Sequence, residues 1–533
     1  MIWLFACKPE AEPPPDYDGD GVERPADCDD DDPAVHPGAE EVWYDGVDQD
    51  CDGNDDDRDA DGVTVAGDCD DADPTAYPGA EEVCGDGADD DCEGSDREIC
   101  APWGELSRDD AAIVFEAFSE TGHGGALAGG DFDGDGIGDL ALGAREETVD
   151  LPVDGAVHVY LSPVALGLHV DDPGDVTLTG PEDRLNAGTA LAAGDLDGDG
   201  LDDLVIGAPA YMQDSREGEV FLARAPFTSD ALADPLERSA GEALDLFGLH
   251  LALVPGLGAD GRPGILAAAP YHGIEDGGAV WRFDADGVEE ARWEEAYGSS
   301  YFGTALCSPG DVDDDGVPDL AIGAPRTPWA TVAGVVFLVP GTALDGGAVE
   351  DAAVATIVSD IESPHGEDGG FGSGLACPGD LDGDGTPDLV VGSWEQDYAE
   401  RDGGAVWLLP AAGRGTVRAE DVAAAALGGG PQERLGYRVG PAGDVDGDGL
   451  ADVTALTFDE ATGTSAWWLL YGGALVDATG PHATASGTSR YGDALEPAAV
   501  GDLTDDGGDD WAVASPQESG DRAYVWIWAG GYD

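Results

Sequence analysis

Short apolar runs alternate along most of this chain with acidic, glycine-rich segments. At 310–325 the sequence reads GDVDDDGVPDLAIGAP, in which an acidic segment is followed by an apolar run and by the turn signal Gly323-Ala324-Pro325. Short apolar runs bounded by Gly and Pro are typical of strands, and Gly316 allows a sharp turn in the acidic segment. The pattern predicts a unit made of a strand, an acidic loop and a second strand.

This unit recurs along the chain, which is the signature of a repeat architecture. A degenerate copy at 256–270 keeps Asp260 and Gly261 but loses most of its acidic positions. Six steps cover the 371 residues from Asp131 to Asp502, so the mean unit has about 62 residues, which suits a four-stranded propeller blade better than a hairpin. We therefore predict an all-β fold, a seven-bladed β-propeller. The first aspartates of the other copies are Asp131, Asp195, Asp311, Asp380, Asp444 and Asp502.

Each unit is predicted to contain an inner strand that ends at the loop, two further strands and an outermost strand. In the second unit the two middle strands are expected at 204–208 and 219–222. The last unit supplies its third strand at 523–528, shortly before the chain ends at Asp533, so its outer strand is expected from 111–118. That pairing would close the ring and remove an exposed sheet edge, and it places the propeller at 103–533.

Residues 16–102 contain a tandem repeat with an offset of 41 and almost no apolar content. In each copy, acidic residues stand at positions 1, 3, 5 and 12 of an EF-hand-like loop, with Gly21 or Gly62 at position 6. Because so few apolar residues cannot form a core, metal and disulfides must hold this region, which we expect to have little regular structure. The expected ligands are Asp16, Asp18, Asp20, Val22 and Asp27 in the first copy, and Asp57, Asp59, Asp61, Val63 and Asp68 in the second.

The cysteines indicate an oxidising compartment. The equivalent positions in the two copies predict the disulfides Cys28–Cys51 and Cys69–Cys92, and Cys84–Cys100 is expected as a third, although sequence alone does not fix connectivity. A zinc site is the alternative, but no CxxC pair is present and aspartates dominate the neighbourhood. In the propeller, Cys307 and Cys377 are expected on inner strands of neighbouring blades, as buried thiols or, less favoured, as a bridge between blades.

The net charge is −94, and Lys8 is the only lysine. Such a chain repels nucleic acid and anionic lipid unless cations neutralise it, which excludes nucleic-acid binding; a solvated acidic surface of the kind found in halophiles is an alternative reason for the charge. The apolar start at 1–6, Cys7 and a Pro/Glu linker through residue 15 resemble a lipoprotein box, with Cys7 as the lipidated residue. The start is too short for a full signal peptide, so a secreted protein with a lost leader is the alternative. We expect a location outside the cell or on its surface, as an outer-membrane lipoprotein if Cys7 is lipidated.

Aspartates at alternating positions of each loop predict a cation site. Ca²⁺ takes six to eight oxygen ligands, including a backbone carbonyl at position 7, whereas crowded carboxylates without a cation would repel one another. The alternative is that these segments are merely polar turns. The expected ligands, blade by blade, are Asp131, Asp133, Asp135, Ile137 and Asp139; Asp195, Asp197, Asp199, Leu201 and Asp203; Asp311, Asp313, Asp315, Val317 and Asp319; Asp380, Asp382, Asp384, Thr386 and Asp388; Asp444, Asp446, Asp448, Leu450 and Asp452; and Asp502, Thr504, Asp506 and Asp510.

The units resemble the FG-GAP repeats of integrin α-subunits and their bacterial relatives. The motifs that carry the resemblance are Phe247-Gly248, Phe302-Gly303 and Phe371-Gly372, the variants Leu435-Gly436 and Tyr491-Gly492, and the closing triplets at 207–209 and 323–325. The resemblance implies a seven-bladed propeller with calcium between the two inner strands of each blade and ligands on the opposite face. The third unit departs from the pattern and is expected to bind no ion, the seventh has Thr504 in place of Asp, and the first lacks a clear Phe-Gly.

The N-terminal copies resemble the acidic, cysteine-containing metal-binding repeats of bacterial surface proteins, a family named for a copper-binding methanotroph protein. The name implies copper, but His36 is the only histidine in this region and Tyr77 replaces it in the second copy. Hard carboxylate ligands favour calcium instead. Calcium is therefore the expected cofactor in both parts of the chain.

Function is predicted from the loops that join the second and third strands, which carry large aromatic residues. Aromatic residues on a surface are common binding anchors, although each can instead pack over its own blade. We expect an extracellular calcium-binding surface protein, a monomer, whose propeller mediates adhesion or binds an extracellular protein or glycan. The residues expected on the ligand face are Tyr211, Tyr271, Trp329, Trp394 and Tyr398.

A secreted hydrolase built on a propeller scaffold is the alternative function. The sequence has no HExxH, GxSxG or P-loop motif, so no catalytic residues are predicted. His250 and His272 in the third unit could flank a pocket, but structural roles are favoured for them. A pair of catalytic carboxylates would be hard to recognise among so many acidic residues.

Overall fold

The computed structural model shows two compact units, residues 1–100 and 101–533, which are described separately here. At some strand residues only the backbone is described. The described residues are 16–22, 26–29, 31–51, 57–58, 63–65, 69, 74, 76–78, 104–106, 111–118, 123–145, 155–164, 166–170, 172–180, 186–210, 217–229, 232, 235–238, 245–273, 276–295, 298–313, 315–326, 334–361, 370–399, 402–411, 413–445, 449–459, 464–473, 483–487, 498–501, 503, 509–518 and 522–528.

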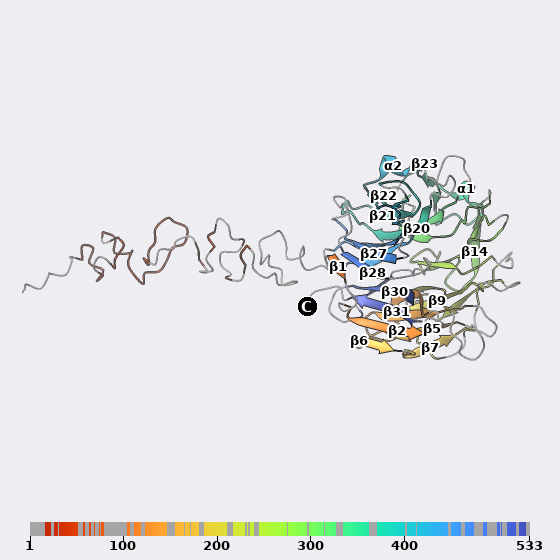
Figure 1. Ribbon diagram of the computed structural model, residues 1–533, viewed down its shortest axis with the longest axis horizontal. Coiled ribbons are helices and arrows are strands. Elements are labelled where there is room, and N and C mark those ends of the chain that lie inside the picture. The colour runs from red at the N-terminus through yellow and green to blue at the C-terminus, as the bar shows by residue number, and fades with distance from the viewer. Residues whose placement is uncertain are drawn as a thin grey trace, which may run out of the picture. The chain divides into compact units, whose positions relative to one another are not determined.

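The second unit contains seven sheets among its described residues, each starting from a short inner strand (Figure 1). The inner strands of blades 1 to 7 are β3 (His123–Gly130), β8 (Ala190–Gly194), β11 (His250–Val254), β15 (Leu306–Gly310), β20 (Phe371–Gly379), β25 (Val439–Gly443) and β29 (Ala498–Gly501). Each inner strand contacts the inner strand of the next blade, and β29 contacts β3. The ring is therefore closed, and the prediction of an all-β, seven-bladed propeller is confirmed.

Two antiparallel strands follow each inner strand. The second strands are β4 (Asp139–Ala144), β9 (Asp203–Ala208), β12 (Gly264–Ala269), β16 (Asp319–Ala324), β21 (Asp388–Ser393), β26 (Asp452–Asp459) and β30 (Asp510–Glu518). The third strands are β5 (Ala156–Tyr160), β10 (Glu219–Ala223), β13 (Ala279–Phe283), β17 (Val335–Val339), β22 (Ala405–Pro410), β27 (Thr464–Leu470) and β31 (Arg522–Trp528).

The outermost antiparallel strands complete the blades. They are β7 (Val176–Thr179), β14 (Glu289–Glu294), β19 (Ala355–Val358), β24 (Ala425–Gly428), β28 (Ala483–Gly487) and β2 (Ile113–Phe118) in blades 1, 3, 4, 5, 6 and 7. In blade 2 a bridge between Phe221 and Pro235 stands at this place. Strand β2 pairs antiparallel with β31 (Figure 1). Blade 7 is thus completed by a strand from the start of the propeller, which pairs with the last strand in the chain.

Four sheets have a fifth, parallel strand at their outer edge, which the sequence did not predict. The segment that precedes the outer strand of one blade pairs with the outer strand of the preceding blade. This arrangement covers sheet edges that would otherwise offer unpaired backbone groups. The parallel strands are β6 (Gly167–Val170), β18 (Gly347–Ala348), β23 (Gly415–Arg418) and β1 (Gly104–Leu106), and short helices α1 (Val349–Ala352) and α2 (Ala419–Val422) follow β18 and β23.

The second strand of each blade is buried on both faces. In β16, Leu320 and Ile322 pack in a cluster that contains Trp293 of blade 3, whereas Ala321 packs in a cluster that contains Leu389 of blade 5. Alternate side chains of a strand point to opposite faces, so one strand contributes to the contacts with both neighbouring blades. The core is thus a ring of layers between blades.

The Phe-Gly and Gly-Ala-Pro motifs meet where two blades touch. The backbone N–H of Gly248 donates to the carbonyl of Ala268 in its own blade at 3.0 Å. The carbonyl oxygen of Gly248 lies 2.1 Å from the point where a Cβ at Gly207 of the preceding blade would stand. Phe247 beside it is buried, 5.2 Å from the ring of Trp281. Glycine at 207 is therefore required by the close approach of two backbones.

The disulfide pattern corrects one expectation. Cys307 on β15 and Cys377 on β20 form a disulfide with a Cα–Cα distance of 5.8 Å, so the favoured prediction of buried thiols is wrong. The inner strands of adjacent blades contact each other, and this brings the two cysteines within bridging distance although 70 residues separate them. Both cysteines line a central cavity of about 460 Å³ between the inner strands.

No helix or strand is present among the described residues of the first unit. Cys28 and Cys51 form the predicted disulfide, with a Cα–Cα distance of 5.7 Å. Cys69 is also disulfide-bonded. Its expected partner Cys92, the expected pair Cys84–Cys100 and the leader with Cys7 lie outside the described residues.

Candidate metal centres

Each complete blade loop folds around the carboxylate of its first aspartate. In blade 1, Asp131 Oδ1 accepts the N–H of Gly134 at 2.7 Å and Oδ2 accepts the N–H of Gly136 at 3.1 Å. The loop continues with Asp133 Oδ1, which accepts the N–H of Asp135 at 3.1 Å. Both glycines have positive φ, +82° and +88°, which glycine adopts at little cost. These bonds wind the chain around the first aspartate.

The same bond between the first aspartate and the glycine at position 6 is found in other blades. The distances are 3.0 Å for Asp195 and Gly200, 2.7 Å for Asp311 and Gly316, 2.8 Å for Asp380 and Gly385, and 2.9 Å for Asp444 and Gly449. Carboxylate oxygens of three residues lie within 4.8 Å of one another in several loops, a spacing that a metal ion could bridge. These groups are Asp131, Asp133 and Asp139; Asp195, Asp197 and Asp199; and Asp311, Asp313 and Asp315.

The aspartate at position 9 is buried and braces the loop. Asp139 Oδ2 accepts the N–H of Phe132 and Oδ1 accepts the N–H of Ser162, both at 2.7 Å. Burial raises the pKa of Asp139 to about 6, although these hydrogen bonds act in the opposite direction. Burial raises the pKa of Asp388 to about 6 for the same reason. The two hydrogen bonds of the aspartate at the loop's end join the loop to the strands. Its equivalents Asp203, Asp319, Asp388, Asp452 and Asp510 are buried and accept backbone N–H groups in the same way.

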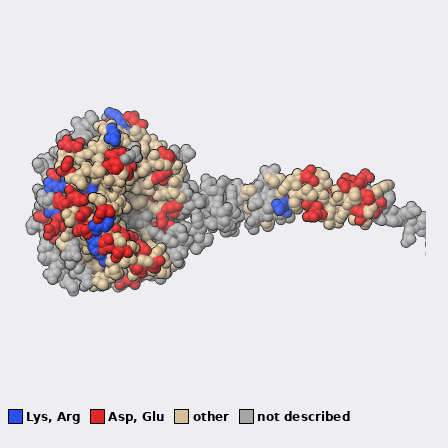
Figure 2. Space-filling view, turned by 180° about the vertical axis from the view of Figure 1, so that it is seen from behind, with Lys and Arg blue, Asp and Glu red and all other residues tan. Residues whose placement is uncertain are grey.

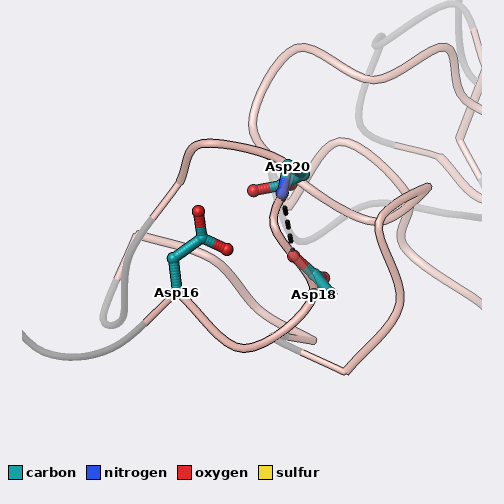
Figure 3. A group of neighbouring side chains, drawn as sticks. All are labelled: Asp16, Asp18 and Asp20. Carbon is teal, nitrogen blue, oxygen red and sulfur yellow. Dashed lines mark hydrogen bonds between the residues drawn. The ribbon is translucent and has the colours of Figure 1, made fainter.

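The first N-terminal loop has the same local geometry without a sheet around it (Figure 3). Asp16 Oδ1 accepts the N–H of Gly19 at 2.6 Å and Oδ2 accepts the N–H of Gly21 at 3.2 Å. Carboxylate oxygens of Asp16, Asp18 and Asp20 lie within 4.8 Å of one another. The local sequence, and not the sheet, therefore specifies the turn.

The donor set of this loop fits a hard divalent cation. Asp18 Oδ2, Asp20 Oδ2 and Asp27 Oδ2 are buried and have no hydrogen-bond partner. A buried carboxylate oxygen without a partner is costly unless a cation or water satisfies it. Burial and the neighbouring carboxylates of Asp20, Asp27 and Asp16 raise the pKa of Asp18. Oxygen-only donors of this kind suit a hard cation such as Ca²⁺.

A second acidic cluster in the first repeat was not predicted. Carboxylate oxygens of Glu41, Asp48 and Asp50 lie within 4.8 Å of one another, and Glu41 Oε2 accepts the N–H of Asp50 at 3.0 Å. The repeat carried the signal, because the offset of 41 places Glu82, Asp89 and Asp91 at the equivalent positions. These three residues lie outside the described part of the chain.

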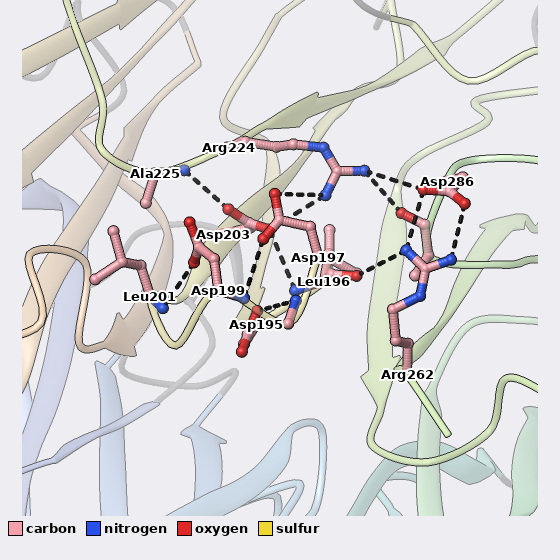
Figure 4. A network of polar contacts seen from close by, with 12 residues as sticks. Asp195, Leu196, Asp197, Asp199, Leu201, Asp203, Arg224, Ala225, Arg262 and Asp286 are labelled. Atoms are coloured by element: carbon pink, nitrogen blue, oxygen red, sulfur yellow. Dashed lines mark hydrogen bonds and ion pairs between the residues drawn. The ribbon is translucent and has the colours of Figure 1, made fainter. Parts of the chain in front are cut away.

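The degenerate blade 3 loop contains a guanidinium. Arg262 Nε donates to Asp260 Oδ2 at 2.6 Å. Its two terminal nitrogens donate to Asp286 at 3.1 and 2.8 Å (Figure 4). Glycines Gly256, Gly258 and Gly264 stand at positions 1, 3 and 9, where complete loops have aspartates. The prediction that this loop binds no ion remains a prediction, and Arg262 supplies positive charge in the loop.

Some predicted ligands lie outside the described residues: Asp446, Asp448, Asp502, Thr504, Asp506, Asp59, Asp61 and Asp68. In the second N-terminal loop, Asp57 and Val63 are the predicted ligands that the structure describes. Of the aromatic residues expected on the ligand face, Tyr211 and Trp329 also lie outside the described part.

Each of the remaining three aromatic residues either lines a cavity or packs over its own blade. Tyr271 and Trp394 line a common cavity, together with Tyr301 and Tyr437, which the sequence did not single out. Tyr398 instead packs over its own blade, with its ring 5.1 Å from that of Trp407. Tyr301 and Tyr437 adjoin the Phe-Gly and Leu-Gly motifs, and that adjacency is the signal that could have found them.

His272 lies between two acidic side chains, and the structural role favoured for it stays a prediction. Its side chain is buried, with Nδ1 3.4 Å from Asp245 Oδ2 and Nε2 3.5 Å from Glu294 Oε1. Arg238 lies beside it and pairs with Asp245 at 2.5 Å. His250 lies on an inner strand and lines the central cavity.

Comparison with known families tests the two resemblances. The FG-GAP repeat family matches residues 123–160, 187–222, 302–339 and 375–409. The chain contains FG-GAP repeats. A family described as a putative metal-binding motif and named for copper binding matches residues 27–57 and 68–98. Both resemblances seen in the sequence are confirmed.

Integrin α chains are among the similar proteins. Integrin alpha pat-2 of Caenorhabditis briggsae is 29% identical over 250 residues, 42% of this chain and 19% of that protein. Integrin alpha-IIb of Homo sapiens is 32% identical over 217 residues, 37% of this chain and 19% of that protein. The chain thus spans about a fifth of the length of these relatives. A solved structure titled as the Dos1 propeller covers 81% of this chain and 96% of that chain, with 12% identity and a TM-score of 0.37.

The matched motifs therefore show FG-GAP repeats preceded by a metal-binding motif in the N-terminal part of the chain. Among the described residues, no helix is long and apolar enough to span a membrane.

Proposed function

We propose that this chain is an extracellular calcium-binding surface protein whose propeller binds a ligand outside the cell and so mediates adhesion. The observation that carries the proposal is the recurrence of inward-facing carboxylates in successive blade loops. The matches to integrin α chains support the surface location, and the FG-GAP repeats support a propeller used for recognition.

Calcium is the ion that the donor set favours. The converging side chains offer carboxylate oxygens, whereas copper is usually held by nitrogen and sulfur ligands. Bound calcium would supply the positive charge that allows several carboxylates to lie close together. The aspartates at positions 1, 3 and 5 would hold the ion, and the buried aspartate at position 9 would fix the loop to the strands and complete the ligand set, as the grouping of Asp139 with Asp131 and Asp133 allows.

The ligand is proposed to bind on the face opposite the cation loops, as a protein or glycan outside the cell. Lipidation of Cys7 would attach the chain, as a monomer, to a membrane. A division between a rigid binding domain and an anchoring segment fits adhesion.

Metal analysis and melting test the calcium part. Mass spectrometry of the purified protein under native conditions should show several bound calcium ions. Removing calcium with a chelator should lower the Tm by about 10 °C or more, because each ion adds roughly 3 kcal/mol at a hundredfold excess over its Kd. The matched control Asp421→Asn changes an exposed carboxylate on α2, outside the loops, and should leave the calcium response unchanged. An unchanged Tm in chelator would remove calcium as a structural element.

Capture experiments test the adhesion part. The full chain, immobilised in calcium, should retain cell-surface proteins or glycans and release them when a chelator is added. The same protein should not hydrolyse a panel of esters and glycosides. Retention of no surface component would contradict ligand binding, and turnover of a panel substrate would favour the hydrolase.

A further inference from the structure

A cavity of about 230 Å³, called here the aromatic-arginine pocket, is formed by residues of blades 3 to 6. Its residues follow second strands or adjoin the starts of inner strands, at the strand ends away from the cation loops. The pocket therefore opens on the face opposite the candidate calcium sites. The side chains that characterise it are Tyr271, Tyr301, Trp394, Tyr437, Arg326 and Arg438.

Two aromatic pairs line the pocket. Tyr271 of blade 3 meets Tyr301 of blade 4 with ring centroids 5.2 Å apart and an interplanar angle of 79°. Trp394 of blade 5 meets Tyr437 of blade 6 at 5.4 Å and 86°. Edge-to-face pairs hold each ring in a defined orientation. Each pair joins residues of two blades, so closure of the propeller sets where these aromatic side chains lie.

Gly370 makes room for Trp394. A Cβ at Gly370 would stand 2.5 Å from Trp394 Cδ1 and 2.6 Å from Nε1. The equivalent positions before the Phe-Gly or Leu-Gly motif hold Tyr301 in blade 4 and Arg434 in blade 6, with φ of 54° and 48°. Blade 5 has no side chain at this position, and the indole occupies that space.

Three guanidinium groups lie over these rings. The Cζ atom of Arg326 is 5.2 Å from the centroid of Tyr301, that of Arg434 is 5.0 Å from Trp394, and that of Arg438 is 5.9 Å from Tyr437. The whole chain has 21 basic residues against 115 acidic ones. On the face shown in Figure 2, basic side chains gather in a few small patches among many acidic residues. Arg326 and Arg438 line the cavity and Arg434 lies over the Trp394 ring, so the pocket carries positive charge that an anion could meet in a strongly acidic protein.

We propose that the aromatic-arginine pocket binds a carboxylated sugar residue of an acidic polysaccharide, an inference that rests on the proposed ligand-binding function. Guanidinium groups pair with carboxylates through two parallel hydrogen bonds, which a neutral sugar does not offer. The aromatic rings provide apolar surfaces for the C–H groups of a sugar ring. The pocket is smaller than the roughly 300–1,000 Å³ of drug-sized ligand sites, which favours a single ring over a peptide segment.

Hydroxyl groups in the pocket fit the same ligand. Thr304 Oγ1 donates to the carbonyl of Tyr301 at 2.6 Å, and Ser373 Oγ donates to the carbonyl of Gly436 at 3.2 Å. A hydroxyl that donates its proton in this way keeps lone pairs that can accept hydrogen bonds from sugar hydroxyls. The carboxylate, the hydroxyl groups and the C–H groups of one sugar residue thus each have a counterpart in the pocket. These counterparts are the guanidinium groups, the hydroxyl groups and the aromatic rings.

Calorimetry on the full chain in calcium tests this proposal. The probes are oligosaccharides that contain glucuronate, galacturonate or neuraminate, the same oligosaccharides after reduction of the carboxyl group, and an oligoglutamate peptide. At least one acidic oligosaccharide should bind, and its reduced form should bind at least about tenfold more weakly. Arg438→Gln and Trp394→Ala should each weaken binding about tenfold or more. The control Arg414→Gln changes an exposed arginine outside the pocket and should leave binding unchanged.

The outcomes separate this proposal from the broader function. Binding of the reduced sugars as tightly as the acidic ones, binding of oligoglutamate alone, or binding of no probe would overturn the carboxylated-sugar proposal. So would acidic-sugar binding that survives both variants, provided that their Tm values match that of the parent chain. If these results came with calcium-dependent retention of other surface components, the ligand-binding function would stand while the pocket assignment failed.

Discussion

The loops of blades 2 and 3 stand side by side, but they differ in their acidic residues and in the positive charge near them (Figure 4). The blade 2 loop keeps aspartates at positions 1, 3, 5 and 9, whereas the blade 3 loop keeps only Asp260 among them. In blade 3, Arg262 holds the pKa of Asp260 and of Asp286 below their ordinary values. The same guanidinium reaches the carbonyl of Leu196 in the blade 2 loop at 3.4 Å.

With the proposed calcium ion in the blade 2 loop, both hairpins would have positive charge near the loop, from an ion in blade 2 and from a guanidinium in blade 3. Arg224 follows the third strand of blade 2 and contacts acidic residues of both blades. Its guanidinium is 3.4 Å from Asp203 Oδ2, 3.6 Å from Asp197 Oδ2 and 3.8 Å from Asp286 Oδ1. A charge fixed to the chain is always present, whereas the proposed ion would be bound only at a sufficient free concentration.

The largest effect is expected when the brace of blade 2 is removed. Asp203→Ala leaves the buried N–H groups of Leu196 and Ala225 without their acceptor and removes one of the carboxylates that Arg224 contacts. The free energy of unfolding should fall by about 3 kcal/mol, in calcium and in chelator alike. Denaturant unfolding measures this change, with the exposed Asp345→Asn as a control. A loss seen only in calcium would show that Asp203 acts mainly as an ion ligand.

A smaller effect, limited to calcium, is expected for Asp199→Asn. Asp199 Oδ1 accepts the N–H of Leu201 at 2.9 Å, and the amide oxygen of asparagine can keep this bond. The change removes one negative charge from the proposed site, so about 1–2 kcal/mol should be lost in calcium and almost nothing in metal-free buffer. Equal losses under both conditions would indicate a purely structural loop.

Arg224→Gln should act in the opposite direction on the ion. The substitution removes a positive charge near Asp197, so the blade 2 loop should bind calcium about three to ten times more tightly. Calcium titration of this variant, compared with Asp199→Asn to assign the site, measures the change. Unchanged or weaker binding would mean that Arg224 supports the site and does not compete with the ion.

The smallest effect is expected for Arg262→Gln in blade 3. Its ion pairs are partly exposed and screened by solvent, so only a small loss of stability is expected, whether or not calcium is present. Because Arg262 lowers the pKa of Asp260 and Asp286, its contribution is present above the ordinary pKa near 4 and is lost as the pH falls through the lowered values. Melting of both proteins from pH 7 to pH 3 should therefore show converging Tm values. A difference that depends on calcium would be inconsistent with a metal-free loop.

Much of the fold and of the candidate metal centres could be predicted because both are local and repeated. Asp131 and Gly136, five residues apart, already specify the turn that brings the carboxylate to the backbone, and the N-terminal loop at Asp16 forms the same turn without a sheet. The pairing of Cys307 with Cys377 could not be predicted with the same confidence, because it depends on how two separate inner strands lie. Arg262 likewise pairs with Asp286, which stands 24 residues away on the next hairpin.

The amino-acid order by itself determined the repeat, the blade strands and the acidic turns, since strand alternation and Asp-Gly turns act over a few residues. The contacts between blades arise from the folded ring: the parallel edge strands, the cross-blade disulfide, the guanidinium in blade 3 and the aromatic-arginine pocket. Closing the ring places positions far apart in the chain next to each other, and no local pattern records which of them will meet.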